Sequence, residues 1–371
     1  RTRPERRMKA LWITSHKDTL NSIRPEAEAL IGLALAGVEM EVMTQGDSVY
    51  REDMEAAGVR VIDYVPERKF DTGSARIIRR RLDEGRHDIV HQCNNKAIAN
   101  GLLAARKWPG KVITSRGQTG NVNRYDPVCW MTHLNPRIDR ITCVAIAVRD
   151  DLRKRMLNPE RAVTVYKGHD LNWYTDTPAD LTEFDIPEGA FVIGAVANYR
   201  PRKGFEVLIE ALRHLPDDTP VHLLLVGGGM DKPKLRKLID ESPLTERIHL
   251  AGFRRDATAI IAACHGSVLA SLKREGLPKT VIEAMVYSVP PIVTDTGGSA
   301  ELVKHRECGL VVPPGDAEAL GRAMHELASN RERAAEMGMR ARTRIECHFN
   351  IRAPITKLLE VYEGALADSP G

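Results

Sequence analysis

The amino-acid sequence predicts an α/β protein of two domains, each built around a doubly wound, mostly parallel β-sheet. The chain has 371 residues, more than one hydrophobic core usually organises. Hydrophobic residues make up 43% of it, which is enough to form two cores. Short apolar runs rich in β-branched residues alternate with segments of helical periodicity. This alternation is typical of a parallel sheet covered by helices on both faces.

The first half of the chain holds one series of expected strands and a clearly patterned helix. Residues 25–36 are expected to be helical, because apolar residues recur on one face and Gly37 follows the last of them. The apolar, β-branched runs predict strands at residues 11–15, 38–43, 59–65, 89–91, 112–115, 141–147 and 163–166. We therefore place a first domain at residues 1–170.

A polar stretch without periodicity, residues 168–187, is expected to link the two domains. A second series of strands is predicted at residues 191–197, 221–226, 248–251, 267–271, 291–294 and 309–312. We place the second domain at residues 171–348 and expect a closing helix within residues 349–371 to cross back to the first. Ligands of such sheets bind beyond the carboxyl ends of the strands. We therefore expect a cleft between the domains, with its chemistry on the loops that follow strands.

Charge is distributed unevenly along the chain, although its net value is only +4. Residues 1–170 hold 30 Lys and Arg against 22 Asp and Glu, and the remainder holds 24 against 28. The basic first half, with its arginine-rich segment 75–86, indicates one of two things. Either it meets an anionic partner, such as a phosphorylated acceptor or a membrane surface, or it is an ordinary solvated surface. No motif predicts a nucleic-acid partner.

The sequence predicts a cytoplasmic protein, either free or peripheral at the inner face of the membrane. No uncharged apolar run approaches the ~18 residues that a membrane-spanning helix needs. No apolar signal-peptide core follows the basic start. The six cysteines show neither the paired spacing of a metal site nor a disulfide pattern.

The most informative segment is a loop and helix that carry two glutamates. Gly276 and Pro278 lie in a loop after an expected strand, and a helix is expected to start near Thr280. A helix start binds anions such as a diphosphate, and the carboxylates of Glu275 and Glu283 can accept hydrogen bonds from hydroxyls. Alternatively, Thr280 and Glu283 form a capping box and Glu275 is an exposed loop residue. The seven-residue spacing, with paired glycines after the next strand, favours the binding site.

This segment resembles the E-x7-E signature of retaining glycosyltransferase family 4, whose members have the GT-B fold of two Rossmann-like domains facing across a cleft. The resemblance follows the order of elements over nearly the whole chain, is most specific at residues 191–316, and points to a bacterial member. It implies that Glu283 contacts the nucleotide ribose and that Glu275 holds the donor sugar. It also implies donor contacts at the adjoining loop and helix start, at Gly276, Leu277, Pro278, Lys279 and Thr280.

A basic segment after the first strand of the second domain is a second candidate for the donor site. Arg200 and Lys203 lie there, and two cations at a strand's carboxyl end can stabilise a leaving diphosphate. A solvated basic turn is the alternative. The resemblance implies a diphosphate clamp of one Arg and one Lys. Many members place the Arg where this chain has Asn198, so Arg200 is expected to substitute, with Arg202 as the other candidate.

Two further loops of the second domain are expected to reach the nucleotide. Gly227 begins a run of three glycines after a strand, which would let a nucleotide approach the backbone closely. Gly252 and Phe253 end another strand at a position that resembles the base-contacting loop of the family. Alternatively, Phe253 is a buried aromatic residue that packs a turn.

The first domain departs from the family pattern and is expected to bind the acceptor. Family members often have a His-Gly pair beside the reacting sugar, where this chain has Arg116-Gly117. An arginine cannot act as a base, but it can hold a diphosphate or an acidic acceptor. His16 and His133 are candidates for the missing imidazole, with a packed or surface histidine as the alternative for each. The acceptor is expected to meet five residues of this domain: Arg116, Gly117, His16, Asn94 and Asn95.

Together with the resemblance, these features predict a retaining, metal-independent hexosyltransferase. It would move a sugar from a nucleotide-diphosphate sugar to a saccharide or glycolipid acceptor, in the synthesis of lipopolysaccharide or another cell-surface glycan. The chain holds no Asp-x-Asp triplet that would bridge a metal to the diphosphate, so we expect no cofactor. The residues do not distinguish the sugar or the base, and UDP is the nucleotide expected first. Two alternatives are a non-catalytic nucleotide-sugar-binding partner and an epimerase or phosphorylase on the same scaffold.

Overall fold

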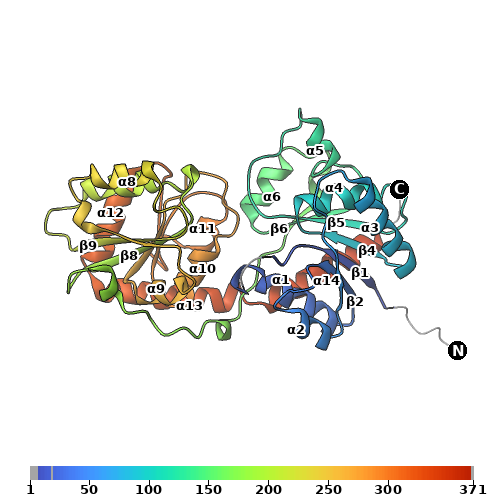
Figure 1. Cartoon of the computed structure of the whole chain (residues 1–371), viewed down its shortest axis with the longest axis horizontal. Helices are drawn as coiled ribbons and strands as arrows, with labels where there is room; N and C mark the ends of the chain where they lie inside the picture. Colours follow the sequence, from blue (N-terminus) through green and yellow to red (C-terminus); the bar gives the residue numbers. More distant parts are fainter. Residues whose placement is uncertain (1–6, 18–19, 369–371) are drawn as a thin grey trace. The chain divides into compact units, whose positions relative to one another are not determined.

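The computed structural model describes residues 7–17 and 20–368 and divides into two units (Figure 1). Unit 1 comprises residues 1–168 and 351–371, and unit 2 comprises residues 169–350. Each unit has a parallel sheet of its own. Each also has hydrophobic cores of its own.

Unit 1 is built on a seven-stranded parallel sheet with the order β3-β2-β1-β4-β5-β6-β7. Its strands are β1 (Lys9–Ile13), β2 (Glu39–Thr44), β3 (Arg60–Asp63), β4 (Ile89–Gln92), β5 (Lys111–Arg116), β6 (Arg140–Cys143) and β7 (Ala162–Thr164). Successive residues of a strand point to opposite faces. Accordingly, Trp12 of β1 packs in one core, whereas Leu11 and Ile13 pack in the core on the other face.

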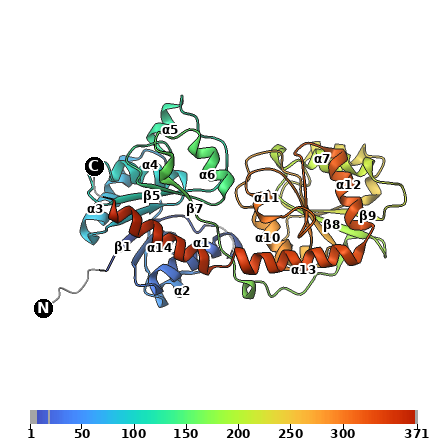
Figure 2. The same ribbon diagram turned by 180° about the vertical axis from the view of Figure 1, so that it is seen from behind.

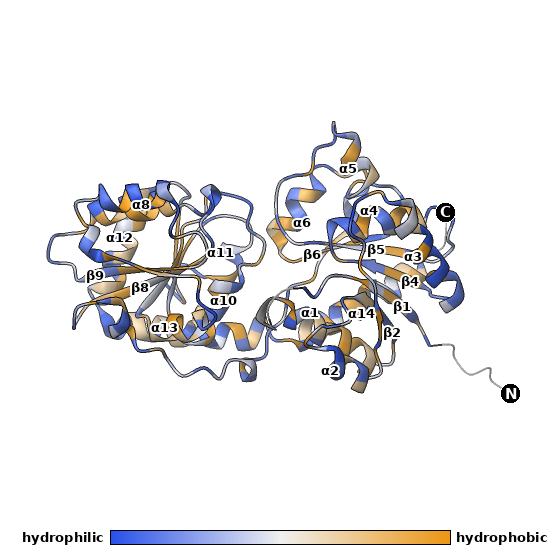
Figure 3. Cartoon of the chain, viewed as in Figure 1, coloured by the Kyte–Doolittle hydropathy of each residue, from blue (hydrophilic) through white to orange (hydrophobic). Residues whose placement is uncertain are grey.

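Helices cover both faces of this sheet. They are α1 (Leu20–Leu35), α2 (Arg51–Ala56), α3 (Thr72–Gly85), α4 (Asn95–Ala104), α5 (Pro127–Met131), α6 (Ile146–Arg153), the short 3-10 helix η1 (Pro159–Arg161) and α14 (Arg352–Ala367). Residues of α1, α2 and α14 share the core of Trp12, and those of α3, α4 and α6 share the opposite core. In Figure 3 the strands are largely apolar and the helices mix apolar with polar residues, as expected for a sheet buried on both faces.

Unit 2 contains a six-stranded parallel sheet with the order β10-β9-β8-β11-β12-β13. Its strands are β8 (Phe191–Val196), β9 (Val221–Val226), β10 (Ile248–Gly252), β11 (Gly266–Leu269), β12 (Pro291–Thr294) and β13 (Leu310–Val312). Its α-helices are α7 (Phe205–Ala211), α8 (Pro233–Asp240), α9 (Ala257–Ala263), α10 (Lys279–Val286), α11 (Ser299–Leu302), α12 (Ala317–Ala328) and α13 (Arg331–His348). Its 3-10 helices are η2 (Leu171–Trp173), η3 (Leu181–Phe184), η4 (Pro201–Lys203), η5 (Leu212–His214) and η6 (Thr245–Arg247).

Both sheets reverse their strand order at the first strand of the unit. In unit 1, β1 lies between β2 and β4, and in unit 2, β8 lies between β9 and β11. The connections on either side of such a strand run to opposite faces of the sheet, which opens a crevice beyond its carboxyl end. The loops that follow β1 and β4, and those that follow β8 and β11, are therefore the natural ligand positions of the two units.

The predicted α/β class with two doubly wound sheets is confirmed, and every predicted strand overlaps an observed one. Several strand boundaries were off by one or more residues, the most at residues 141–147. The expected strand 141–147 ends at Cys143, and Ile146 already begins α6, because Ala145 is the extended residue that precedes that helix. The helix expected from Pro25 starts at Leu20 and contains Pro25 in its second turn.

A buried hydrogen-bonded chain fixes the C-terminal helix α14 to unit 1. The hydroxyl of Tyr362 lies 2.9 Å from Nδ1 of His91, and Nε2 of His91 lies 2.8 Å from Oγ of Ser115. The imidazole also stacks on Trp12, with ring centroids 4.7 Å apart. Burial lowers the pKa of His91 to about 3, so its ring is neutral at physiological pH. Figure 2 shows α14 running beside α1 on this face.

We expect a Tyr362→Phe substitution to lower the free energy of unfolding of unit 1 by about 1–3 kcal/mol, because it leaves Nδ1 of His91 buried without this partner. Denaturant unfolding measures the change. The matched control is Tyr125→Phe, at a residue 86% exposed, for which we expect a change within about 0.5 kcal/mol. Equal effects of the two substitutions would contradict the role given to Tyr362.

Candidate active site

The loops that follow β8 and β11 are joined by their backbones. The N–H of Leu272 donates to the carbonyl of Arg202 at 2.8 Å. Gly204 ends the η4 turn at a φ of +69°, and a Cβ there would lie 2.0 Å from the carbonyl oxygen of Ala270. Only glycine fits this left-handed, closely approached position. The contact therefore holds the basic η4 turn against the carboxyl end of β11.

The loop after β12 supports the same region from the other side. The N–H of Gly298 donates to the carbonyl of Gly276 at 2.7 Å. Gly297 has a φ of +54°, and a Cβ there would lie 2.2 Å from the carbonyl oxygen of Glu275. The paired glycines of the sequence thus serve to pack one loop against the backbone that carries Glu275.

The glycine run after β9 is tied to both of its neighbours. The N–H of Gly227 donates to the carbonyl of Gly252 at 2.7 Å, and the N–H of Gly228 donates to Oδ1 of Asn198 at 2.8 Å. Asn198, which stands where many family members have an arginine, therefore holds the glycine loop. Phe253 follows Gly252 and is 67% exposed, so the alternative of a buried aromatic residue is wrong.

One carboxylate oxygen lies at the centre of these loops. Oε1 of Glu275 accepts hydrogen bonds from Oγ of Ser271 at 2.7 Å, Nζ of Lys203 at 2.7 Å and Nη1 of Arg202 at 3.2 Å. Glu275 is only 6% exposed, so the alternative of an exposed loop residue is wrong. A carboxylate is stable in such a place when it is paired and hydrogen-bonded.

The structure separates the two candidate arginines of the basic turn. Arg202 reaches Glu275 together with Lys203. Arg200, the residue favoured by the sequence, precedes η4 in an extended conformation and is exposed. In the sequence, Arg202 could have been identified because it directly precedes Lys203. In the 3-10 turn η4, the side chains of these two neighbours reach the same carboxylate. Ser271 was not predicted at all, because a serine at a strand end carries no signal of its own.

Helix α10 starts at Lys279, one residue before the expected start, with Pro278 as its N-cap. The alternative of a capping box formed by Thr280 and Glu283 is not observed, and among the described residues no side chain caps this helix. The N–H groups of Val281 and Ile282 donate to the carbonyl of Pro278, whereas those of Lys279 and Thr280 precede the first helical hydrogen bond and can donate to a ligand. Glu283 is buried, and its Oε1 pairs with Nζ of Lys279 at 3.0 Å. Burial raises the pKa of Glu283. Gly276 and Leu277 lie in the preceding loop.

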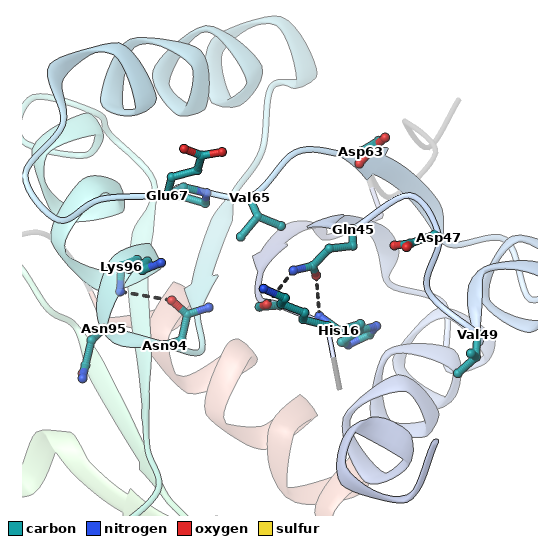
Figure 4. A pocket seen from close by; sticks show the side chains of 13 residues that line it. His16, Gln45, Asp47, Val49, Asp63, Val65, Glu67, Asn94, Asn95 and Lys96 are labelled. Atoms are coloured by element: carbon teal, nitrogen blue, oxygen red, sulfur yellow. Dashed lines mark hydrogen bonds between the residues drawn. The ribbon is translucent and has the colours of Figure 1, made fainter. Parts of the chain in front are cut away.

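In unit 1, three predicted acceptor residues line one cavity of about 830 Å³ at the carboxyl ends of β1 to β4 (Figure 4). They are His16, Asn94 and Asn95. Oδ1 of Asn94 accepts the N–H groups of Lys96 at 3.0 Å and Ala97 at 2.9 Å, so it caps α4. Six other charged or amide side chains line the cavity: Lys17, Gln45, Asp47, Asp63, Glu67 and Lys96.

The imidazole of His16 is engaged inside the protein. Its Nδ1 lies 3.1 Å from Oγ of Ser48, and its Nε2 lies 3.5 Å from Oε1 of Glu26. Burial raises the pKa of Glu26, but the interaction with His16 and the charge of Lys167 bring it below its usual value. For the ring of His16, the alternative of a packed histidine is therefore the one observed. Its backbone N–H donates to Oε1 of Gln45 at 2.7 Å.

Arg116 is buried beside the second candidate histidine. Its Nη1 lies 3.2 Å from Nε2 of His133, and its Nη2 donates to the carbonyl of Gly120. The same His133 nitrogen lies 3.2 Å from Oδ1 of Asn95. Burial and the charge of Arg116 lower the pKa of His133 to about 3. Gly117 lies elsewhere, in the lining of a smaller cavity of about 120 Å³. Arg116 and Gly117 are thus outside the lining of the larger cavity.

Two family models match successive parts of the chain. The model described as Glycosyltransferase Family 4 matches residues 27–173, and the model described as Glycosyl transferases group 1 matches residues 176–344. The chain belongs to glycosyltransferase family 4.

Among the described residues, no helix combines the length and apolarity needed to cross a membrane.

Curated relatives agree with this assignment. The lipopolysaccharide core biosynthesis glycosyltransferase LpsE of Rhizobium meliloti is 32% identical over 162 residues, 43% of this chain and 46% of the relative. A GDP-mannose-dependent alpha-mannosyltransferase of Mycolicibacterium smegmatis is 28% identical over 272 residues, 69% and 70% of the two chains. The chain spans about half the length of the first curated relatives it matches.

The solved structures establish the GT-B fold. Anabaena Alr3699/HepE in complex with UDP has a TM-score of 0.77 at 19% identity, covering 96% of this chain and 100% of that one. A glycosyltransferase from Rickettsia africae has a TM-score of 0.80 at 18% identity, covering 98% and 100%.

A Gly204→Ala substitution is expected to lower the free energy of unfolding of unit 2 by about 1–3 kcal/mol more than Gly189→Ala does. Both glycines have a positive φ, but only the Cβ at position 204 meets a backbone carbonyl, whereas position 189 is open. The difference between the two alanine variants in denaturant unfolding therefore isolates the packing of η4 on β11. Indistinguishable variants would show that this packing contributes nothing.

Proposed function

We propose that the protein transfers a sugar from a nucleoside-diphosphate sugar to a hydroxyl of a saccharide or glycolipid acceptor, with retention of configuration and without a metal ion. The observation that carries the proposal is the buried carboxylate of Glu275, held by Ser271 and two cations beside the open N-terminus of α10. This arrangement provides acceptors for sugar hydroxyls and positive charge for a diphosphate within one group of loops.

In the proposed donor complex, each charged group has a distinct task. The first-turn N–H groups of α10 and the ammonium of Lys203 bind the diphosphate, whose negative charge grows as the sugar leaves. Glu275 accepts hydrogen bonds from the sugar hydroxyls, and Glu283 accepts them from the ribose. Gly252 and Phe253 contact the base. These cations and helix dipoles take the place of a bridging metal ion.

The proposed reaction needs no imidazole base. The bond between the anomeric carbon and the phosphate oxygen breaks, and its electron pair remains on that oxygen. The acceptor oxygen then bonds to the anomeric carbon on the same face, and its proton passes to the leaving phosphate. Two observations support this route. Both ring nitrogens of His16 face protein groups, and the pKa of His133 is about 3, so His133 binds a proton weakly.

We propose the cavity of unit 1 (Figure 4) as the acceptor site. Carboxylates such as Asp63 and Glu67 can accept hydrogen bonds from saccharide hydroxyls, and Lys17 and Lys96 can donate. Arg116 is connected to this site through His133 and Asn95. The printed names of several relatives refer to lipopolysaccharide core, amylovoran and colanic acid biosynthesis. These names support a cell-surface glycan as the product.

We also propose a cytoplasmic location, free or peripheral at the inner face of the membrane through unit 1. The arginines of α3 are a poor basis for that contact, because three of them pair with acids: Arg79 with Asp83, Arg80 with Glu84 and Arg81 with Glu41. A better basis is the α5 region, where Tyr125, Val128 and Met131 are 86%, 46% and 47% exposed. Exposed aromatic and apolar side chains of this kind insert at a membrane interface.

A Glu275→Gln variant is expected to lose about 10²-fold or more in kcat/KM for sugar transfer, because it loses the charge that accepts the sugar hydroxyls and pairs with Lys203. The matched control is Glu246→Gln, an exposed residue of η6, which should keep the wild-type value. An unchanged rate for Glu275→Gln would remove this residue from the mechanism. NMR of the product also tests the stereochemistry, since an inverted anomeric centre would contradict retention.

A thermal-shift series with UDP, GDP and ADP, each beside its nucleoside, tests the donor site directly. We expect one diphosphate to stabilise the protein by ~2.7 kcal/mol at ~100 times its Kd, and its nucleoside to stabilise it much less. UDP is the first candidate. If none of the three diphosphates raises the unfolding temperature above that of its nucleoside, the nucleoside-diphosphate-sugar proposal is wrong.

A further inference from the structure

We propose that a further cavity of unit 1 binds a phosphate group. The cavity has a volume of about 850 Å³ and lies at the amino ends of β5 and β6, at the opposite end of the sheet from the proposed acceptor site. Three cations of its lining come from different elements: Lys111 starts β5, Arg140 starts β6 and Arg161 ends η1. The site is separate from the proposed donor and acceptor sites, so the inference does not depend on the proposed function.

The first argument is that a carboxylate of the protein itself occupies part of this cavity. Nη2 of Arg140 donates to Oδ2 of Asp368 at 2.5 Å, and Nζ of Lys111 donates to the backbone carbonyl of Asp368 at 2.7 Å. The hydrogen bond from Arg140, with the charges of Lys111 and Arg161, lowers the pKa of Asp368. Asp368 follows the last residue of α14, where the helix dipole disfavours a negative charge. The cations hold the carboxylate there despite the dipole, so the cavity attracts an anion.

The second argument is the positive charge that remains after this contact. Asp139 pairs with Arg137 at 2.9 Å, and Asp368 pairs with Arg140. Within the described parts of the chain, the partly buried Arg161 forms hydrogen bonds to backbone carbonyls but no ion pair. The cavity lining therefore has more positive than negative charge. Its four cations and three carboxylates are Lys111, Arg137, Arg140 and Arg161 against Asp139, Glu160 and Asp368.

The third argument is the hydrogen-bonding capacity that remains on two guanidinium groups. Arg161 uses Nη1 for the carbonyls of Pro136 and Ile138, each at 2.8 Å, and these bonds fix its position. Arg140 uses Nη1 and Nη2 within the protein. Among the described residues, Nε of both arginines and Nη2 of Arg161 donate to no protein group. The planar fork of a guanidinium suits phosphate oxygens, so Arg161 offers a phosphate its free edge.

Simple anchoring of α14 through Asp368 is the competing explanation, and one substitution separates the two. If the cavity binds phosphate, Asp368 competes with the ligand for Arg140, and Asp368→Asn strengthens phosphate binding. If the cavity serves only to anchor the helix, Asp368→Asn lowers the unfolding temperature and leaves phosphate binding unchanged.

The experiment is fluorine NMR on the full chain labelled with 5-fluorotryptophan. Trp108 lines the cavity and belongs to unit 1, whereas the proposed donor site lies in unit 2, so its signal reports on this cavity. The substitution Trp108→Phe assigns the signal. Inorganic phosphate is the probe, and sodium chloride at the same ionic strength controls for screening. We expect phosphate to shift the Trp108 signal saturably and chloride to leave it in place.

The variants should change the phosphate affinity in opposite directions. We expect Arg161→Gln and Arg140→Gln each to weaken binding by about 10-fold, because each removes a charged donor. We expect Asp368→Asn to strengthen binding by about threefold or more, because the competing negative charge is removed. Two exposed residues of unit 2 provide the matched controls, and Arg236→Gln and Asp218→Asn should bind phosphate as the wild type does.

Three results would overturn the inference. They are a Trp108 signal that responds to chloride as it does to phosphate, an unchanged affinity in Arg161→Gln, and an affinity that Asp368→Asn does not raise. Thermal unfolding shows which variants are folded. If Arg161→Gln is not, Arg161→Lys decides, with a smaller loss of affinity expected because it keeps the charge but not the fork. No loss in that variant would equally contradict the inference.

The phosphate can belong to a soluble monoester or to a lipid headgroup, and the same signal distinguishes the two sources. The probes are glucose 6-phosphate and phosphatidylcholine vesicles that contain phosphatidic acid, with glucose and pure phosphatidylcholine vesicles as neutral controls. We expect the soluble monoester to bind, because Lys111 and Arg140 line a cavity and are only 15% and 21% exposed. A response to the acidic vesicles alone would overturn the soluble source, and an equal response to glucose would overturn the phosphate assignment.

Discussion

The structure of unit 2 depends on one buried carboxylate. Glu275 accepts hydrogen bonds from Ser271, Lys203 and Arg202 through a single oxygen. Removing such a charge from water is costly unless it is paired and hydrogen-bonded, so the loops that supply the partners must stay in place. Two backbone hydrogen bonds hold these loops in place, one from Leu272 to Arg202 of η4 and one from Gly298 to Gly276. The same contacts place two cations around Glu275, four residues before the start of α10.

Unit 1 has the same kind of crevice but different chemistry. Its cavity lies beyond β1 and β4, at the reversal of strand order, and its lining combines acids, amides and lysines. The candidate imidazoles are engaged by protein groups: His16 faces Ser48 and Glu26, and His133 contacts Arg116. Such a surface suits recognition of hydroxyls better than proton abstraction. The proposed chemistry therefore relies on the leaving phosphate, which the unit 2 cations stabilise.

The sequence predicted the strands and the loop positions well, because strand ends in a doubly wound sheet are marked by apolar runs and glycines. It predicted Glu275 and Glu283 as a pair, although their roles stay predictions. It did not predict side-chain direction. Whether Arg200 or Arg202 reaches Glu275 depends on the η4 turn. Whether the imidazole of His16 is free depends on its contacts with Ser48 and with Glu26 of α1. The start of α10 was placed one residue late, because Pro278 rather than Thr280 is its N-cap.

The most direct test of the central claim is a crystal structure of the chain with its nucleoside diphosphate. We predict phosphate oxygens at about 3 Å from Nζ of Lys203 and from the first N–H groups of α10. We also predict that a carboxylate oxygen of Glu283 lies at a similar distance from a ribose hydroxyl. A nucleotide bound away from the loops after β8 and β11, or bound there with Glu283 turned from the ribose, would contradict the account.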